Sequence, residues 1–291
     1  MSQSPPPILY ELDLGDVLGR SFSLYKRNFL KYFLVFLSIQ AIIGLLTTLV
    51  MLAFPIPKLS PTATPQEALN FLPVLLAALF LQLTLTLVVS WLFSSISTGA
   101  TIRFTSDVLQ KGQGDMQASL GYTLSKLPPI LAVGLVTGLL TFLGAIALIV
   151  PGIILAIMFS LSLPVLLIEN AGVLDSMGRS RLLVGNRWLK TFGLLLVLGV
   201  IGVAVGIVSS LVSAPFGLSS TLVNSLIAAV YLPIYPITLT VYYYSNRSRL
   251  AQPQSAMPWT MPSGFKFCPS CGTQLPAISV FCTKCGTKQP G

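Results

Sequence analysis

Four cysteines near the C-terminus form the pattern with the clearest chemistry. Residues 267–273 read FCPSCGT, and residues 281–287 read FCTKCGT, 14 positions later. Two residues between paired cysteines let one tight turn direct both thiolates at a single ion, and four thiolates satisfy the tetrahedral preference of Zn²⁺. Because four protein ligands leave no open coordination position, the expected zinc is structural rather than catalytic. The predicted ligands are Cys268, Cys271, Cys282 and Cys285.

Two disulfides or a redox-active pair are the alternative explanations for these cysteines. We expect the tail in the cytoplasm, where thiols stay reduced, and this favours zinc over disulfides. Two matched copies without thioredoxin-like surroundings disfavour a redox pair. The glycines after each second cysteine, Gly272 and Gly286, are predicted to take the positive φ that closes the turn. Phe267 and Phe281 are predicted to pack over the metal, because so short a module has little other core.

The tail closely resembles the short zinc-ribbon module that is attached to many bacterial and archaeal proteins. The resemblance rests on the two Phe-Cys-x-x-Cys-Gly copies, and it implies zinc at the four cysteines and no activity. The module carries only three basic residues, Lys266, Lys284 and Lys288, and no arginine. This is little charge for nucleic acid, so we expect the ribbon to dock a protein partner in the cytoplasm.

The composition of the whole chain is that of a membrane protein. Of its 291 residues, 54% are hydrophobic and only 9% are charged, whereas soluble domains carry roughly 25% charged residues. High hydrophobicity with low charge excludes a disordered chain. The sequence contains no histidine, which removes histidine bases, histidine-activated nucleophiles and histidine metal sites. No catalytic residue is predicted, and we expect a protein that is not an enzyme.

The uncharged stretches predict six membrane-spanning helices, since one span takes roughly 20 residues. The first two are expected at 32–54 and 71–98. Stretches of 42 and 56 uncharged residues follow Lys126 and Lys190, and each is long enough for two spans. Proline and glycine predict the breaks within them, at 150–152 and at 215–217.

The basic residues predict the orientation of these spans. Alternate loops hold 16 and 1 of the lysines and arginines, so the positive-inside rule places both termini in the cytoplasm of a protein of the cell membrane. Trp188 and Tyr242 to Tyr244 are expected at the cytoplasmic edge, as an aromatic belt. Glu169 is expected to be solvated at the same edge.

A partial internal repeat precedes two of the spans. Gly19 to Phe33 matches Gly178 to Phe192 at a constant offset of 159, and Asp115 to Leu127 occupies the equivalent place before the third span. We expect three units, each an amphipathic cytoplasmic helix followed by a helical hairpin. A repeat-built lipid or substrate path and a simple anchoring role both remain open.

The membrane part resembles a family of six-span membrane domains found alone or fused to glycerophosphodiester phosphodiesterases. The resemblance spans most of residues 8–248, and no phosphodiesterase domain is present, so it implies no catalytic residue. The residues that carry it are Leu14-Gly15-Asp16-Val17-Leu18, Tyr25-Lys26-Arg27-Asn28-Phe29, Ile168-Glu169-Asn170-Ala171-Gly172-Val173, Ser176, Arg179-Ser180 and Trp188.

Two further features have a structural and a functional interpretation. The pairs Gly134/Gly138 and Gly202/Gly206 allow close helix approach, which we expect inside the bundle, with a homodimer as the alternative. In the sixth span, Pro233 and Pro236 predict a broken helix. Transporters use such helices at binding sites, although proline kinks are also common without that role.

We therefore predict an all-α integral membrane protein with six transmembrane helices, cytoplasmic amphipathic helices and a small C-terminal zinc ribbon. The expected function is that of a non-enzymatic membrane protein whose ribbon docks a partner or that organises the membrane. The alternative is a transporter or flippase for an uncharged or amphiphilic solute. The expected parts are a cytoplasmic amphipathic segment (1–31), a six-span domain (32–248), a linker (249–264) and the ribbon (265–291).

Overall fold

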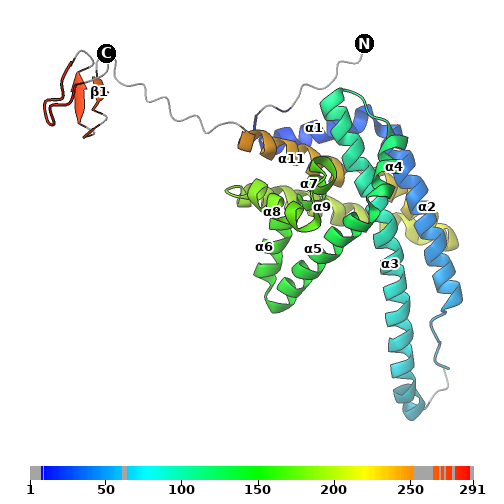
Figure 1. Ribbon diagram of the computed structural model, residues 1–291. Helices are drawn as coiled ribbons and strands as arrows, with labels where there is room; N and C mark the ends of the chain where they lie inside the picture. Colours follow the sequence, from blue (N-terminus) through cyan, green and yellow to red (C-terminus); the bar gives the residue numbers. More distant parts are fainter. Residues whose placement is uncertain are drawn as a thin grey trace. The chain divides into compact units, whose positions relative to one another are not determined.

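The structure, a computed structural model, describes residue 8 and residues 10–60, 64–251, 265–268, 270–271, 273–276 and 279–288. The chain divides into two compact units, Met1–Ser248 and Arg249–Gly291, which are described separately. The first unit is helical (Figure 1), and the second contains a two-stranded antiparallel sheet. Most of the predicted linker, residues 252–264, lies outside the described residues, and a helix continues through Ala251.

The elements follow one another as eleven α-helices, one 3₁₀-helix and two strands within the described ranges. They are α1 (Leu14–Arg27), α2 (Phe29–Ala53), α3 (Pro65–Lys111), α4 (Met116–Ser125), α5 (Leu127–Ala147), α6 (Ile149–Phe159), α7 (Ser162–Glu169), α8 (Val173–Val184), α9 (Trp188–Ser213), η1 (Ala214–Ser219), α10 (Ser220–Tyr231), α11 (Ile234–Ala251), β1 (Phe265–Phe267) and β2 (Gln274–Pro276).

Six segments of the described chain are long and apolar enough to cross a membrane, as predicted. They are Phe29–Ala53, Leu69–Lys111, Leu127–Ala147, Ile149–Glu169, Trp188–Phe216 and Leu222–Leu250. The longest lies in α3, whose start is fixed by a capping box between Thr64 and Glu67 and by a proline at the first position. Its end is fixed by Gly112, which has a φ of 77°.

The sequence repeat corresponds to a structural repeat. Helices α1 and α8 begin at Leu14 and Val173, and helices α2 and α9 begin at Phe29 and Trp188. Both pairs of starts are separated by the 159 residues of the sequence offset. Helix α4 stands in the same place before α5. The order of three short helices, each followed by a helical hairpin, is therefore confirmed, and the second arms of the last two hairpins are each broken into shorter helices.

The buried core of the first unit lies where the short helices meet the long ones. It combines Tyr32 of α2, Phe104 of α3, Leu183 of α8 and Ile237 of α11. The α2–α3 pair and the α5–α6 hairpin extend away from it (Figure 1). Their extended parts expose large apolar side chains such as Phe80. An apolar surface of this kind suits contact with lipid rather than water.

The break between the third and fourth candidate spans differs from the predicted one. The helices separate at Leu148, which is in the extended region, and Pro151 lies in the first turn of α6. A proline in a first turn interrupts no hydrogen bond, because the amide there has no partner within the helix. Gly152 serves close packing instead of a turn. A Cβ at this position would lie 2.8 Å from backbone atoms of Ala145.

The predicted glycine pairs do not provide the close packing expected of them inside the bundle. Only Gly134 meets a neighbouring helix, at Trp91 of α3. At Gly138, Gly202 and Gly206, no atom of the described residues outside the local helix backbone lies within 4 Å of where a Cβ would stand. The expectation of internal packing is therefore wrong at these three positions, where a Cβ would meet open space.

Candidate functional site

The predicted metal ligands lie on two turns with the same local geometry. In each turn the first cysteine donates its backbone N–H to a threonine carbonyl at 2.9 Å, from Cys268 to Thr273 and from Cys282 to Thr287. The second turn closes through Gly286, which has a φ of 72° as predicted. Gly272 lies outside the described residues. Strands β1 and β2 pair antiparallel, with Phe267 opposite Gln274, and flank the first turn.

These turns bring the four thiols into one cluster. All four Sγ atoms lie within 4.8 Å of one another, with 3.5 Å between Cys268 and Cys285 and 3.6 Å between Cys271 and Cys282. An ion held tetrahedrally at about 2.3 Å from each sulfur separates the sulfurs by roughly 3.8 Å. Cys268 and Cys282 are buried, whereas Cys271 and Cys285 are exposed. The donor set therefore fits one structural Zn²⁺.

The small apolar core of the ribbon differs from the predicted one. Leu275 of β2 is buried with Cys268 and Cys282, whereas Phe281 is 58% exposed. Phe281 therefore does not pack over the metal as expected. Its backbone forms an isolated antiparallel bridge with Lys288. The side chain of Phe267 lies outside the described part of the ribbon.

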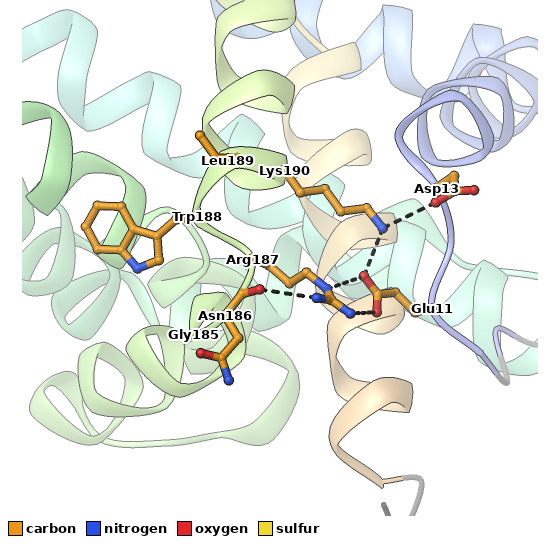
Figure 2. Close-up of a pocket in the computed structure, with 8 residues that line it drawn as sticks. All are labelled: Glu11, Asp13, Gly185, Asn186, Arg187, Trp188, Leu189 and Lys190. Carbon is orange, nitrogen blue, oxygen red and sulfur yellow. Dashed lines mark hydrogen bonds and ion pairs between the residues drawn. The ribbon is translucent and has the colours of Figure 1, made fainter.

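An ion-pair site joins the N-terminal segment to the start of α9 (Figure 2). Glu11 accepts two hydrogen bonds from the guanidinium of Arg187, both at 2.6 Å, and one from Lys190 at 2.8 Å. The Lys190 Nζ also lies 3.7 Å from Asp13. Beside these groups is a surface hollow of about 890 Å³. A two-point contact between arginine and carboxylate fixes orientation as well as distance.

The electrostatics of this site favour the ionised forms of both partners. The hydrogen bond from Arg187 is the main cause that lowers the pKa of Glu11, to about 2, and Lys190 adds to it. The same bond raises the pKa of Arg187. The two carboxylates balance the two cations, so the site attaches the N-terminal segment rather than presenting unpaired charge.

Three consecutive tyrosines of α11 bond to three different helices. Tyr242 shares a 2.7 Å hydrogen bond with Thr191 of α9, and Tyr243 donates to Glu169 of α7 at 2.7 Å. Tyr244 bonds Ser106 and Gln110 of α3. Tyr242 and Tyr243 are fully buried, so the predicted aromatic belt is wrong for them.

Glu169 is also less solvated than expected, because Tyr243 and the guanidinium of Arg179 cover it. Sequence reasoning missed both the tyrosine cluster and the Glu11–Arg187 pair. A single signal was available, since three adjacent tyrosines on a helix point in three directions and cannot all face lipid.

Comparisons with known proteins bear on both units. Residues 267–289 match the zinc-ribbon domain, and residues 115–246 match a domain of unknown function (DUF7847), over 132 of the 291 residues. These matches do not show the predicted likeness to the phosphodiesterase-fused membrane domains, which stays a prediction. No curated protein and no solved structure matches the chain. The chain is therefore a membrane protein with six candidate spans that carries a C-terminal zinc ribbon.

Proposed function

We propose that this is a non-enzymatic, multi-pass protein of the cell membrane whose zinc ribbon docks a protein partner in the cytoplasm. The 16-to-1 distribution of basic residues between alternate loops supports a cytoplasmic position for both termini. In this orientation α1, α4 and α8 lie along the cytoplasmic surface of the membrane. A metal site with four protein ligands has no position for substrate, which supports a structural role.

The observation that carries the docking proposal is an exposed apolar pair beside the metal cluster. Val280 is 56% exposed and Phe281 is 58% exposed, although a module this small has few apolar side chains to bury. Large apolar side chains that are exposed instead of buried in the core are typical of protein contact sites. The same ribbon offers little positive charge, so a protein is favoured over nucleic acid.

Affinity purification of the full chain after cross-linking in cells tests this proposal. We expect specific co-purifying proteins that are lost when residues 265–291 are deleted, and also lost in a Val280→Ser, Phe281→Ser variant that still binds zinc. A Lys284→Ser variant is the matched control, and nuclease treatment should change nothing. An unchanged set of partners in the deletion would contradict docking.

A transporter or flippase for an uncharged or amphiphilic solute is the second candidate. The observation that favours it is the broken sixth span, where α10 ends at Tyr231 and α11 begins at Ile234, with Pro233 in the gap. Broken helices of this kind supply binding sites in transporters.

A second copy of the chain is another partner to test, since Gly202 and Gly206 leave one face of α9 open.

A further inference from the structure

A groove lies among the candidate spans, between α3, α5, α6, α7 and α11. Its volume is about 580 Å³, within the range of roughly 300–1,000 Å³ found for small-molecule sites. Along α5 it is lined from Ile130 to Ala145, which corresponds to about 22 Å at 1.5 Å per residue. This length exceeds the roughly 15 Å of one leaflet of the hydrocarbon core.

The lining of the groove is apolar, with hydroxyl groups and no charge. None of the described residues that line it is Asp, Glu, Lys or Arg, so a charged group inside it would find no counter-ion among them. Its polar side chains include Thr98 of α3, Thr137 of α5, Ser162 of α7 and Tyr235 of α11. This combination suits an apolar chain that carries an uncharged hydrogen-bonding group.

The hydroxyl of Ser162 is buried and has no partner among the described residues. Thr137 and Ser160 donate to carbonyls of their own helices, at 2.7 Å and 2.9 Å. Ser162 is only 1% exposed, and its Oγ forms no hydrogen bond with any described residue. A buried polar group without a partner costs about 1–3 kcal/mol. The Oγ is fully covered in this structure, so an acceptor oxygen on a bound molecule would remove this cost once the Ser162 side chain rotates towards the groove.

The depth of the hydroxyls fits the ester region of a lipid. Ser162 lies seven residues before Glu169, and Thr98 lies five residues before Arg103. Both are therefore about 8–10 Å along their helices from a charged residue. We take these charged residues to mark the outer edge of the polar region of the leaflet, which is roughly 5–8 Å thick. On that basis we expect the hydroxyls near the level where ester groups join the acyl chains.

We propose that this groove binds one acyl chain of a glycerolipid, with Ser162 donating a hydrogen bond to the ester carbonyl. The surrounding medium supplies such chains, the uncharged lining excludes head groups, and the length accommodates a chain that enters from one leaflet. The site does not depend on the ribbon, and binding requires no transport. An experiment can therefore contradict the lipid-binding proposal without contradicting the docking proposal, and the reverse.

Photo-cross-linking of the full-length protein tests this site. The protein is placed in vesicles of palmitoyl-oleoyl phosphatidylcholine with a small share of the same lipid carrying a diazirine in its acyl chain. Mass spectrometry then locates the adducts. We expect them to concentrate on residues 130–145 of α5 and 235–239 of α11. Adducts spread evenly over all exposed apolar helices, including α9, would show ordinary surrounding lipid and overturn the proposal.

Matched glycine substitutions distinguish the groove from the rest of the apolar surface. Gly138 lines the groove and has open space above it, and Gly202 of α9 is equally open but does not line it. Gly138→Leu should lower α5 labelling about tenfold, whereas Gly202→Leu should change it less than about twofold. Thr141→Phe blocks the same groove, should the first variant fold poorly. Unchanged labelling in a folded blocking variant would overturn the proposal.

The ester contact is tested by competition. Unlabelled diester lipid should displace the probe about threefold better than the matching diether lipid, because only the ester offers a carbonyl acceptor. In Ser162→Ala this difference should disappear, while labelling of α5 persists. Equal competition by the two lipids in the unsubstituted protein would overturn the assignment of Ser162.

Discussion

The phenol of Tyr243 donates a 2.7 Å hydrogen bond to Oε1 of Glu169, 74 residues earlier in the chain. This contact joins α11 to the end of α7, where Arg179 of α8 approaches the same carboxylate at 3.4 Å. One carboxylate thus holds three helices together at the packed end of the membrane unit.

Tyr243→Phe should destabilise this unit by about 1–3 kcal/mol, because it removes a buried donor to a charged acceptor. Thermal unfolding in detergent measures the change. Tyr235→Phe is the matched control. The Tyr235 hydroxyl forms no hydrogen bond with any described residue, so its loss should leave the unfolding temperature unchanged. Equal effects of the two substitutions would show that the Glu169 contact contributes nothing.

The Glu11–Arg187 pair should make attachment of the N-terminal segment depend on pH. The pKa of Glu11 is lowered from 4.5 to about 2, so its contribution is fully present above about pH 4.5 and is lost as the pH falls towards 2. Glu11→Gln should cost about 1 kcal/mol at neutral pH and remove this pH dependence. Asp13→Asn, at a side chain that is 94% exposed, should do neither. Protease sensitivity of the N-terminal segment across this pH range measures the effect, and an identical profile for Glu11→Gln would contradict it.

Close approach of α5 and α6 predicts a large difference between two glycines. Gly152→Ala places a methyl group 2.8 Å from the backbone of Ala145 and should destabilise the hairpin by about 1–3 kcal/mol. Gly138→Ala meets nothing and improves helix propensity, so it should be neutral or slightly stabilising. Denaturation of the two variants side by side checks the prediction. If Gly152→Ala leaves the stability unchanged, α5 and α6 move apart more easily than the close contact suggests.

Single cysteines test the proposed orientation, in a chain whose ribbon cysteines are replaced by serine. Ser60→Cys should react with an impermeant maleimide on intact cells, because its loop carries the single basic residue of the sparse side. Ser125→Cys, also exposed in the structure, should react only after permeabilisation. Ser119 and Ser176 are buried and cannot serve this purpose. Labelling of Ser125→Cys in sealed cells would contradict the proposed orientation.

The sequence predicts well whatever depends on local spacing. The ribbon follows from two short copies of one turn, and the helices follow from the lengths of the apolar stretches. The corresponding first residues of α1 and α8 follow from the 159-residue repeat.

The sequence does not predict the contacts between residues that are distant along the chain, for physical reasons. Glu11 and Arg187 lie 176 residues apart, and nothing local distinguishes them from other surface charges. Tyr242 and Tyr243 resemble belt residues until the fold surrounds them. Gly152 was expected in a turn because its packing partner, Ala145, is known only once the hairpin is built.

Chelation should unfold the ribbon and leave the membrane unit intact. Structural zinc supplies on the order of 10–16 kcal/mol at neutral pH, far more than a core of Leu275 and two cysteines can provide. Limited proteolysis should then cut within residues 265–291 and spare the helices. Cys271→Ser should produce the same pattern without chelator, whereas Ser270→Ala should not.

Elemental analysis of the purified full chain is the most direct measurement of the metal centre. One zinc ion per chain is the expected result, falling well below one in Cys271→Ser. The metal centre would be contradicted by a protein that carries no zinc. In such a protein the four cysteines would react freely with a thiol reagent while the ribbon stays folded.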